Sequence, residues 1–230
     1  MTEKQEIFTL LDGRIKMLRS EYNTTSDAVW LAALPEVAPK NVLDVGIGTG
    51  GVALCLHHHF PDAKIMGIDI AQDMLNICAK NATLNQCDIE LENQDILSWS
   101  TPRTFDLVVS NPPYFLGTPS KKHPQAHHNV DLSRWIKRCA ARVCPQGYFC
   151  TIVDASRLGE VMGVICKSFG SITLVPLFGA KQTAERVLIR ARLCNRGGSV
   201  IHIGYPMRYD PILREGLTIQ NILSKIDPQC

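Results

Sequence analysis

Four consecutive residues carry the clearest chemistry in this chain. Asn111, Pro112, Pro113 and Tyr114 follow an apolar stretch, 105–110, that has the pattern of a buried strand. The side-chain oxygen of Asn111 and the carbonyl of Pro112 can both accept hydrogen bonds from one amino group on a planar system. Such an amino group is a poor nucleophile because its lone pair is delocalised, and two in-plane acceptors direct that lone pair outward. Prolines hold the acceptors rigid and Tyr114 can stack on the planar group, so the tetrad predicts activation of an exocyclic amine. A rigid turn is the structural alternative.

A glycine-rich turn supplies a second candidate site. Gly46, Gly48 and Gly50 follow the strand-like run 41–45 and precede an apolar helical pattern. A strand that turns through glycines into a helix brings bare backbone close to a ligand. Asp44, just before the glycines, would repel a pyrophosphate but suits a ligand with a cationic, amine-bearing end. This charge favours S-adenosylmethionine over a dinucleotide, although glycine-rich turns also occur without any ligand.

Two further acids follow predicted strands. Asp69 lies near the end of the mostly apolar run 65–70, roughly 20 residues after the glycines. At this place such folds hold a ribose through its hydroxyls. Asp95 follows a third strand, 89–92, and could accept a hydrogen bond from an adenine amino group; a solvated loop position is an equally good interpretation. The order of these features predicts an adenosine-type cofactor.

A long polar loop, 115–129, follows the tetrad. Loops of this length in compact domains are usually functional or disordered. It carries Lys121, Lys122 and His127, together with two more histidines. The histidine spacing matches no common metal site and nearby acids are lacking, so we expect no metal. We expect instead a lid that faces the substrate and contacts phosphate.

Other segments have clear helical or strand patterns. A helix over about 132–143 carries Arg134, Lys137, Arg138 and Arg142; such charges are usually only solvated, and phosphate binding is the less favoured interpretation. Asp27 marks a helix start near its N-cap. The remaining expected elements are a hairpin around Gly13, helices over 28–34, 72–85 and 157–168, and strands over 148–153, 172–177 and 186–193.

Composition narrows the class of protein. The 230 residues are 45% hydrophobic with a net charge of +2, which neither indicates nor excludes a nucleic-acid partner. No apolar run approaches the ~20 residues of a membrane span, and the polar start is no signal peptide. Nine cysteines without any Cys-x-x-Cys indicate free thiols in a reducing cytoplasm. We expect an N-terminal extension over 1–40, a core over 41–195 and a tail of the same domain over 196–230. The oligomeric state is not indicated.

The order of strands, glycines, acids and tetrad resembles the class I S-adenosylmethionine-dependent methyltransferases. The resemblance implies an α/β, Rossmann-like fold: a seven-stranded, mostly parallel sheet with its last strand antiparallel and helices on both faces. It assigns Asp44 and the glycines to the methionine end of the cofactor and Asp69 to the ribose. It assigns Asp95 and Ile96 to the adenine, and Ile70 and Asn111 complete the expected cofactor contacts.

A closer resemblance involves the N-terminal segment. Residues 22–28, followed by an apolar helix, look like the start of the bacterial enzymes that N6-methylate an adenine beside the anticodon of a valine tRNA. That group also has a Phe after the tetrad, here Phe115. Its N-terminal segment closes over the cofactor, which implies that Tyr22 and Asp27 lie near the methionine moiety. The implied substrate contacts are Pro113, Tyr114 and Phe115, and the implied partner is RNA, most simply tRNA.

Several other functions fit the same residues. The tetrad also occurs in enzymes that methylate a glutamine in release factors, and a guanine amine in rRNA is a further acceptor of the same type. A non-catalytic nucleotide- or RNA-binding module would not need the amine-acceptor pair. A Rossmann dehydrogenase fits less well because Asp44 conflicts with the phosphates.

Overall fold

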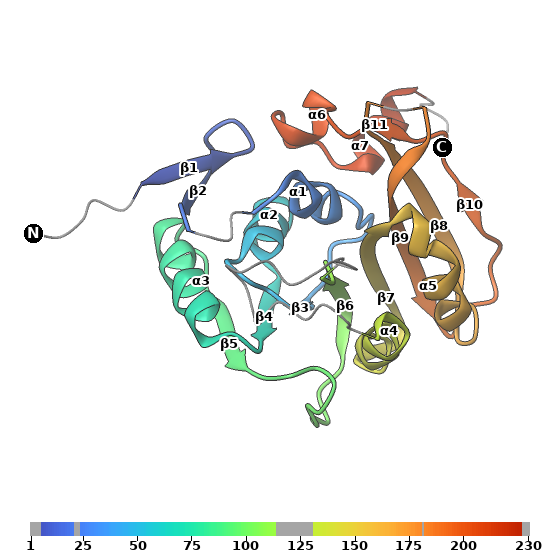
Figure 1. The fold of residues 1–230 in the computed structure, drawn as a ribbon, viewed down its shortest axis with the longest axis horizontal. Helices are drawn as coiled ribbons and strands as arrows, with labels where there is room; N and C mark the ends of the chain where they lie inside the picture. The colour runs from blue at the N-terminus through green and yellow to red at the C-terminus, as the bar shows by residue number, and fades with distance from the viewer. Residues whose placement is uncertain (1–5, 21–23, 114–130, 181, 227–230) are drawn as a thin grey trace, which may run out of the picture.

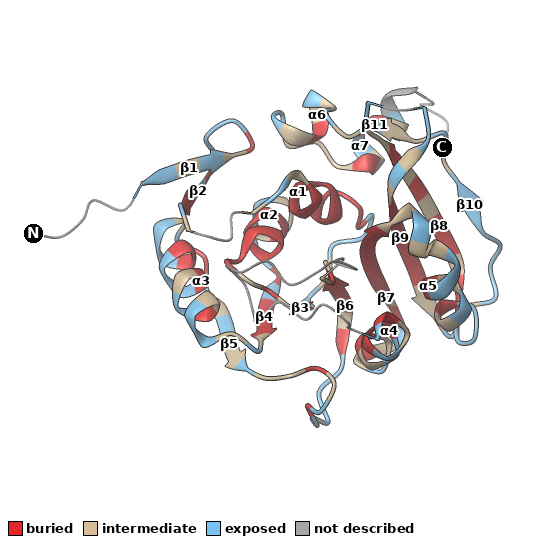
Figure 2. Cartoon of the chain, viewed as in Figure 1, coloured by how far each residue is buried: buried red, intermediate tan, exposed pale blue. Residues whose placement is uncertain are grey.

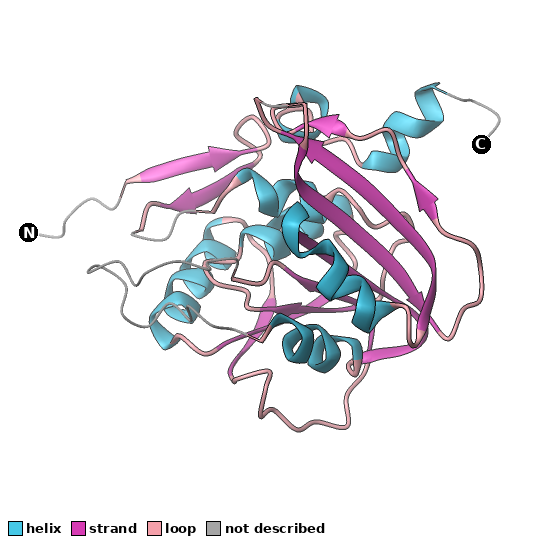
Figure 3. Cartoon of the chain, turned by 45° about the vertical axis from the view of Figure 1, so that its right-hand side comes forward, coloured by secondary structure: helices cyan, strands magenta, loops and turns pink. Residues whose placement is uncertain are grey.

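The computed structural model describes residues 6–20, 24–113, 131–180 and 182–226. A twisted sheet runs through the centre of the molecule (Figure 1, Figure 3). Seven strands lie in the order β8-β9-β7-β6-β3-β4-β5, with β9 antiparallel to both of its neighbours and the other neighbouring pairs parallel. This confirms the predicted mostly parallel sheet with an antiparallel last strand. The strands are β3 (Asn41–Val45), β4 (Lys64–Asp69), β5 (Ile89–Asn93), β6 (Phe105–Ser110), β7 (Val143–Asp154), β8 (Phe169–Phe178) and β9 (Ala184–Leu193).

The central strands are apolar along nearly their whole length because both faces of the sheet are covered. In register, Leu43 of β3 lies between Met66 of β4 and Val108 of β6, and all three side chains are buried. The carboxyl ends of β3, β4 and β6 therefore meet at one edge of the sheet, where α/β folds bind their ligands.

The C-terminal tail extends this sheet. β10 (Val200–Ile201) and β11 (Tyr205–Pro206) both pair in parallel with β8, so the sheet has nine strands within the described residues. The sequence left the placement of this tail open. The two short strands cover the edge of β8 that would otherwise expose its unpaired backbone groups.

Helices cover both faces of the sheet, as expected (Figure 1). Side chains of α4 (Leu132–Ala140) and α5 (Leu158–Ile165) join one buried cluster, and a short 3-10 turn, η1 (Ala155–Arg157), precedes α5. The other buried cluster takes side chains from five helices: α1 (Ser26–Ala32), α2 (Gly51–His59), α3 (Gln72–Leu84), α6 (Asp210–Leu213) and α7 (Ile219–Ile226).

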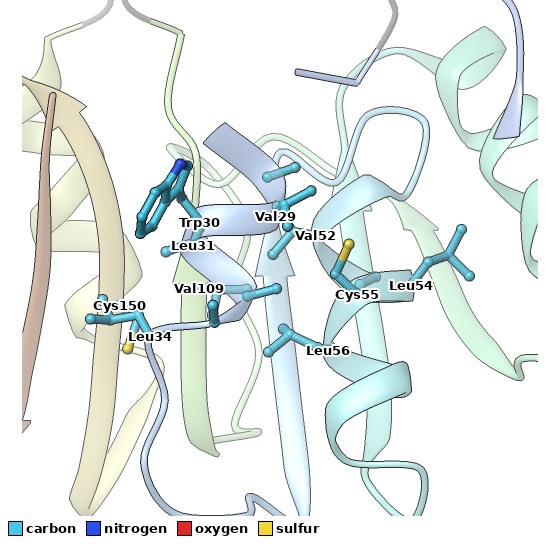
Figure 4. Packing of buried hydrophobic residues seen from close by; sticks show 14 of the residues in the cluster. Val29, Trp30, Leu31, Leu34, Val52, Leu54, Cys55, Leu56, Val109 and Cys150 are labelled. Atoms are coloured by element: carbon cyan, nitrogen blue, oxygen red, sulfur yellow. The ribbon is translucent and has the colours of Figure 1, made fainter. Parts of the chain in front are cut away.

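Helix α1 lies at the centre of the larger cluster. Trp30 and Leu31 are fully buried and belong to the same buried cluster as Leu56 of α2 and Val109 of β6 (Figure 4). Burial is concentrated in α1, α2 and the middle strands, whereas the outer faces of α3 and the N-terminal hairpin are exposed (Figure 2). Every residue of α1 after Ser26 is buried, so this helix belongs to the core although it precedes the first strand of the sheet.

The predicted N-terminal hairpin is present as β1 (Ile7–Leu10) and β2 (Ile15–Leu18). Asn81 of α3 and Asn85, the C-cap of the same helix, hold it against the core. The side-chain oxygen of Asn81 accepts the amide of Leu18 at 2.8 Å, and Asn85 exchanges two hydrogen bonds with the backbone of Lys16, at 2.8 and 2.7 Å. The hairpin is thus attached to the cofactor-binding half of the sheet.

Several predicted boundaries were wrong. Helix α5 ends at Ile165 rather than at 168, and β7 begins at Val143 rather than at 148. Helix α4 ends at Ala140, three residues before its expected end at 143. Val143 pairs instead with Phe105 at the start of β7, and the carbonyl of Arg142 accepts the amide of Phe105 at 2.9 Å. Strand pairing with β6 therefore ends the helical segment before its apolar pattern does.

Candidate active site

A cavity of about 430 Å³ lies at the carboxyl edge of β3, β4 and β6. Seven of the predicted cofactor residues line it: Gly46, Gly48, Asp69, Ile70, Asp95, Ile96 and Asn111. Asn111 and Pro113 of the tetrad line the same cavity. The fold therefore brings most of the predicted cofactor residues and the predicted amine acceptor to one open cavity.

The glycine turn forms one wall of this cavity. Gly46 and Gly48 have φ angles of 73° and 54°, a conformation that favours glycine. The amides of Gly46 and Ile47 both donate to the carbonyl of Ile68, at 2.9 and 3.0 Å, which joins the ends of β3 and β4. A Cβ built on Gly48 would meet no atom within 4 Å, so the space in front of this residue is open.

Gly50 has a different role. Its φ is 92°, and a Cβ there would lie 2.8 Å from the sulfur of Cys78 on α3. Gly50 does not line the cavity. It permits α2 and α3 to approach closely, so this predicted ligand contact serves packing in the described structure.

Asp44 lies one residue before Val45, which lines the cavity, but its own side chain is buried and is not part of the lining. The carboxylate accepts a hydrogen bond from the amide of Ala53, and Oδ2 has no hydrogen-bond partner. Burial, together with the nearby charge of Asp69, raises the pKa of Asp44 to about 7. An unpartnered buried carboxylate oxygen fits a ligand with a cationic end better than one with a phosphate.

Asp69 connects the glycine turn to β4. Its Oδ2 accepts the amide of Gly48 at 2.8 Å and its Oδ1 accepts the amide of Ala71 at 2.9 Å. Each carboxylate oxygen has a second lone pair, so the half-buried side chain can still accept two hydroxyl donors from the cavity. This arrangement suits the two hydroxyls of a ribose.

The loop after β5 presents Asp95 and Ile96. The side chain of Asp95 accepts the amide of Leu97 at 2.9 Å, which fixes the turn. Arg138 of α4 donates to the carbonyl of Ile96 at 3.0 Å and also to the carbonyl of Trp99. Arg142 donates to the carbonyl of Thr101 further along the loop. The expectation that these two arginines are only solvated was wrong: they hold the loop against α4.

Ser110 positions the start of the tetrad. Its hydroxyl donates to the carbonyl of Val45 at 2.9 Å and accepts from the indole of Trp135 at 3.0 Å. Asn111 follows directly and is half-buried, and Pro112 behind it is buried. Two strands and α4 thus fix the backbone from which Asn111 enters the cavity.

The N-terminal extension closes another side of the cavity. Thr24, Thr25 and Ala28 line it, and the hydroxyls of Thr24 and Thr49 lie 3.1 Å apart. Asp27 was expected near the N-cap and the cofactor. Asp27 does lie in the first turn of α1, two residues after the N-cap Thr25, but it does not line the cavity. Its carboxylate pairs instead with Arg186 at 3.2 Å.

Some expected residues cannot be placed, and some cavity residues were not expected. Tyr22, Tyr114, Phe115, Lys121, Lys122 and His127 lie outside the described residues. Trp135 was missed because a tryptophan in a helix carries no sequence signal for a cavity wall. Thr24 and Thr25 lie in the segment 22–28 that resembles the tRNA enzymes. That resemblance was the only signal in the sequence for their place in the cavity wall.

The described residues contain no group of three or more His, Cys, Asp or Glu side chains placed to hold a metal ion. Their cysteines are free thiols. Burial raises the pKa of Cys55, Cys78 and Cys150 to about 12, so these thiols stay protonated. No helix within the described ranges is both long and apolar enough to span a membrane.

Comparison with known families places the chain. Residues 23–176 match the methyltransferase small domain family. The chain belongs to this family. Among curated relatives, the tRNA1(Val) (adenine(37)-N6)-methyltransferase of a Flavobacteriaceae bacterium, strain 3519-10, is 33% identical over 144 residues, which cover 60% of this chain and 62% of the relative. The release factor glutamine methyltransferase of Koribacter versatilis is 40% identical over 89 residues, covering 36% of this chain and 32% of that one.

The chain thus spans less than two thirds of the length of each of these two relatives.

Solved structures resemble the chain in fold. A predicted O-methyltransferase, Atu636 from Agrobacterium tumefaciens, matches with a TM-score of 0.64 at 20% identity, over 78% of this chain and 86% of that one. At this identity the likeness concerns the arrangement of the sheet and helices alone.

Proposed function

We propose that this protein is an S-adenosylmethionine-dependent N-methyltransferase that methylates N6 of an adenine in tRNA. One observation carries the proposal. Asn111, directly after β6, lines the same cavity as Asp69 at the end of β4 and Asp95 in the loop after β5. An amine acceptor therefore stands beside a set of groups suited to an adenosine-type ligand with a cationic end.

The residues of the cavity divide by the part of the cofactor they would hold. The open glycine turn at Gly46 and Gly48, with the buried charge of Asp44 behind it, suits the methionine end. Asp69 suits the ribose hydroxyls, and Asp95 with Ile96 suits the adenine. When bound, S-adenosylmethionine supplies a methyl group on a positively charged sulfur.

The chain's own residues would prepare the acceptor. The carboxamide oxygen of Asn111 and the carbonyl of Pro112 hold the two protons of the amine in one plane and orient its lone pair. With its lone pair oriented in this way, the amine could accept the methyl group that S-adenosylmethionine would supply, and its surplus proton would pass to water. Because Ser110 is hydrogen-bonded on both sides, these acceptors are oriented before the substrate arrives.

The substrate class rests on two lines of support. The relative from the Flavobacteriaceae bacterium is named for adenine-37 of a valine tRNA, and the N-terminal segment 24–28 enters the cavity wall as that resemblance implies. The relative from Koribacter versatilis is named for release-factor glutamine, a planar amide that the same acceptor pair could grip. Methylation of a protein glutamine is therefore the second candidate.

A labelling experiment tests the proposal. The purified protein is incubated with methyl-labelled S-adenosylmethionine and either total tRNA or total protein from a strain that lacks it, and the products are hydrolysed and separated. We expect label in N6-methyladenosine from tRNA and none with an Asn111→Ala control. Label in N-methylglutamine would overturn the tRNA substrate but retain the amine chemistry. Label in neither fraction would overturn the proposed activity.

A further inference from the structure

Helix α4 is unusually rich in positive charge. Arg134, Lys137 and Arg138 lie within it and Arg142 follows it, and there is no acid from 132 to 142. These side chains are spaced three or four residues apart, so like charges face one another along the helix, which destabilises an isolated helix. The whole chain has a net charge of only +2, so this concentration is local.

The four basic side chains fall into two pairs with different environments. Arg138 and Arg142 are half-buried and donate to carbonyls of the loop after β5. Arg134 and Lys137 are exposed, and neither side chain has an ion-pair or hydrogen-bond partner among the described residues. We call Arg134 and Lys137 the α4 ridge.

Three exposed arginines elsewhere in the described chain are neutralised by acids, whereas Arg14, Arg196 and Arg208 are exposed without an ion pair to another described residue. Arg19 pairs with Glu6 at 3.0 Å and Arg103 pairs with Glu90 at 2.7 Å. Arg214 likewise pairs with Asp210, at 3.1 Å. The two acids near the start of α4 have other partners: Asp131 accepts the amide of Arg134 at 2.9 Å as the N-cap, and Glu160 pairs with Arg157 at 2.7 Å. The charges of Arg134 and Lys137 are therefore available to an external anion.

The ridge also lies next to the candidate site. Arg134 directly precedes Trp135, which lines the cavity and donates to Ser110, the residue before Asn111. A polymer that delivers a planar amine to Asn111 would therefore approach the first turn of α4, where Arg134 lies, and Lys137 would contact a more distant part of the same polymer. The backbone of RNA carries a negative charge at every nucleotide, whereas a peptide backbone carries none.

We propose that the α4 ridge binds the phosphate backbone of the RNA substrate and orients the target base toward Asn111. This inference rests on the proposed function for the identity of the polymer. Phosphate contacts position a nucleic acid without reading its sequence, so the ridge contributes affinity and orientation but not base selectivity.

The test measures binding of total tRNA to the full-length protein by filter retention, over a range of salt concentrations. The ridge variant is Arg134→Gln with Lys137→Gln. The matched control is Lys64→Gln with Lys167→Gln, because these exposed lysines lie at the start of β4 and after α5, and neither lines the cavity. Binding of S-adenosylmethionine, measured by calorimetry, reports whether the site of each variant is intact.

We expect the ridge variant to bind tRNA about tenfold more weakly than the wild type, with unchanged cofactor affinity. The slope of log affinity against log salt should become shallower by about 1–2, since each lost phosphate contact removes about 0.7–0.9. The control should bind as the wild type does. Equal tRNA binding by the ridge variant and the wild type would overturn the inference, as would wild-type protein that does not bind tRNA at all.

The outcomes separate this inference from the proposed function. If the wild type binds tRNA through the ridge but places no methyl group on it, the proposed function is wrong and the RNA-binding role of the ridge is retained. If the ridge variant methylates tRNA with the same KM as the wild type, the proposed function is retained and the RNA-binding role of the ridge is wrong. Loss of binding to a protein substrate, with tRNA binding unaffected, would replace RNA by an acidic protein partner and overturn the inference.

Discussion

Asp44 holds its carboxylate in a place that water does not reach. Its pKa of about 7 lies above that of an ordinary aspartate, chiefly because burial disfavours the charged form. In the ligand-free protein this residue therefore stabilises the fold most below its unfolded pKa and loses that contribution as the pH rises through about 7. A cationic ligand would reverse the preference of Asp44 for its protonated form, because the positive charge favours the ionised carboxylate.

The affinity for S-adenosylmethionine should therefore depend on pH. We expect the dissociation constant to fall as the pH rises from about 5.5 to 7.5, with a slope that approaches tenfold per pH unit well below the pKa. Isothermal calorimetry measures this slope directly. Asp44→Asn should bind more weakly at pH 7.5 and show a flat profile; a wild-type profile that is equally flat would contradict the role of Asp44.

Asn111 should contribute to turnover but little to cofactor binding. We expect Asn111→Ala to lower kcat by at least about 100-fold, comparable to the loss of one oriented polar group in other active sites. The dissociation constant for S-adenosylmethionine should change less than about threefold. Single-turnover kinetics and calorimetry give the two values. A variant with near-normal kcat would show that Asn111 does not hold the amine.

Individual site residues were predictable where they end a strand. Asp69 and Asn111 stand directly at such ends, so an apolar run followed by a polar residue located them. Trp135 was not predictable, because its approach to Gly46 depends on how α4 packs across the sheet. A Cβ on Gly46 would lie 3.4 Å from the Trp135 ring, a contact between residues far apart in the sequence.

Among the elements, α1 depends on an ion-pair network for its attachment. Arg186, near the start of β9, pairs with Asp27 of α1 at 3.2 Å and with Asp154 at the end of β7 at 3.0 Å. Burial raises the pKa of Asp27, and the charge of Arg186 opposes this rise. Thr25 and Ala28 of the same segment line the cavity, so the network holds one wall of the site.

Breaking this network should affect both stability and cofactor binding. Arg186→Gln should lower the free energy of unfolding by about 2–3 kcal/mol because it leaves Asp27 buried without a charge partner. The deficit should be smaller at pH 5 than at pH 8, since the raised pKa of Asp27 lets it become neutral as the pH falls. Urea titrations at the two pH values measure this difference.

A double-mutant cycle supplies the control for this prediction. Asp27→Asn in the Arg186→Gln background should restore more than half of the lost stability, since no buried charge remains. The KM for S-adenosylmethionine should rise about tenfold in Arg186→Gln. Additive losses of stability in the double variant would show that the two side chains are not coupled.

Most elements could be read from the sequence, because hydrophobic periodicity and glycine or proline boundaries are local signals. The seven strands and the helices between them followed such patterns. The end of α4 and the use of Arg138 and Arg142 could not be read, because both depend on partners in another segment: Phe105 for the strand and the loop carbonyls for the arginines. Charged residues in a helix look alike whether they face water or a neighbouring loop.

At the scale of the whole molecule, the C-terminal tail completes the core around α1. The indole of Trp30 donates to the carbonyl of Met207 at 2.9 Å, and the amide of Ile219 donates to the carbonyl of Ala33 at 2.9 Å. Ile219 and Ile222 of α7 are buried in the same cluster as α1. The sequence did not reveal this closure, because a Gly- and Pro-rich tail with short apolar runs does not specify its partner.

The tail should therefore be needed for stability. Ile222→Ala should lower the free energy of unfolding by about 2–4 kcal/mol, the usual range for truncating a buried isoleucine. Ile203→Ala is the matched control, because that side chain is 98% exposed and should change stability by less than about 0.5 kcal/mol. Chemical denaturation of both variants tests this, and equal stabilities would show that α7 does not support the core.

The contacts between α1 and α7 also have a consequence for biosynthesis. The amide of Ile219 that closes on Ala33 is made long after α1 itself has left the ribosome. At about 5–20 residues per second, the delay is on the order of ten seconds or more. Throughout that interval the apolar side chains of α1 lack their final cover, so a growing chain must shield them by transient contacts or by a chaperone. The cavity wall that α1 provides gains its full cover only after residue 222 has left the ribosome and packed against it.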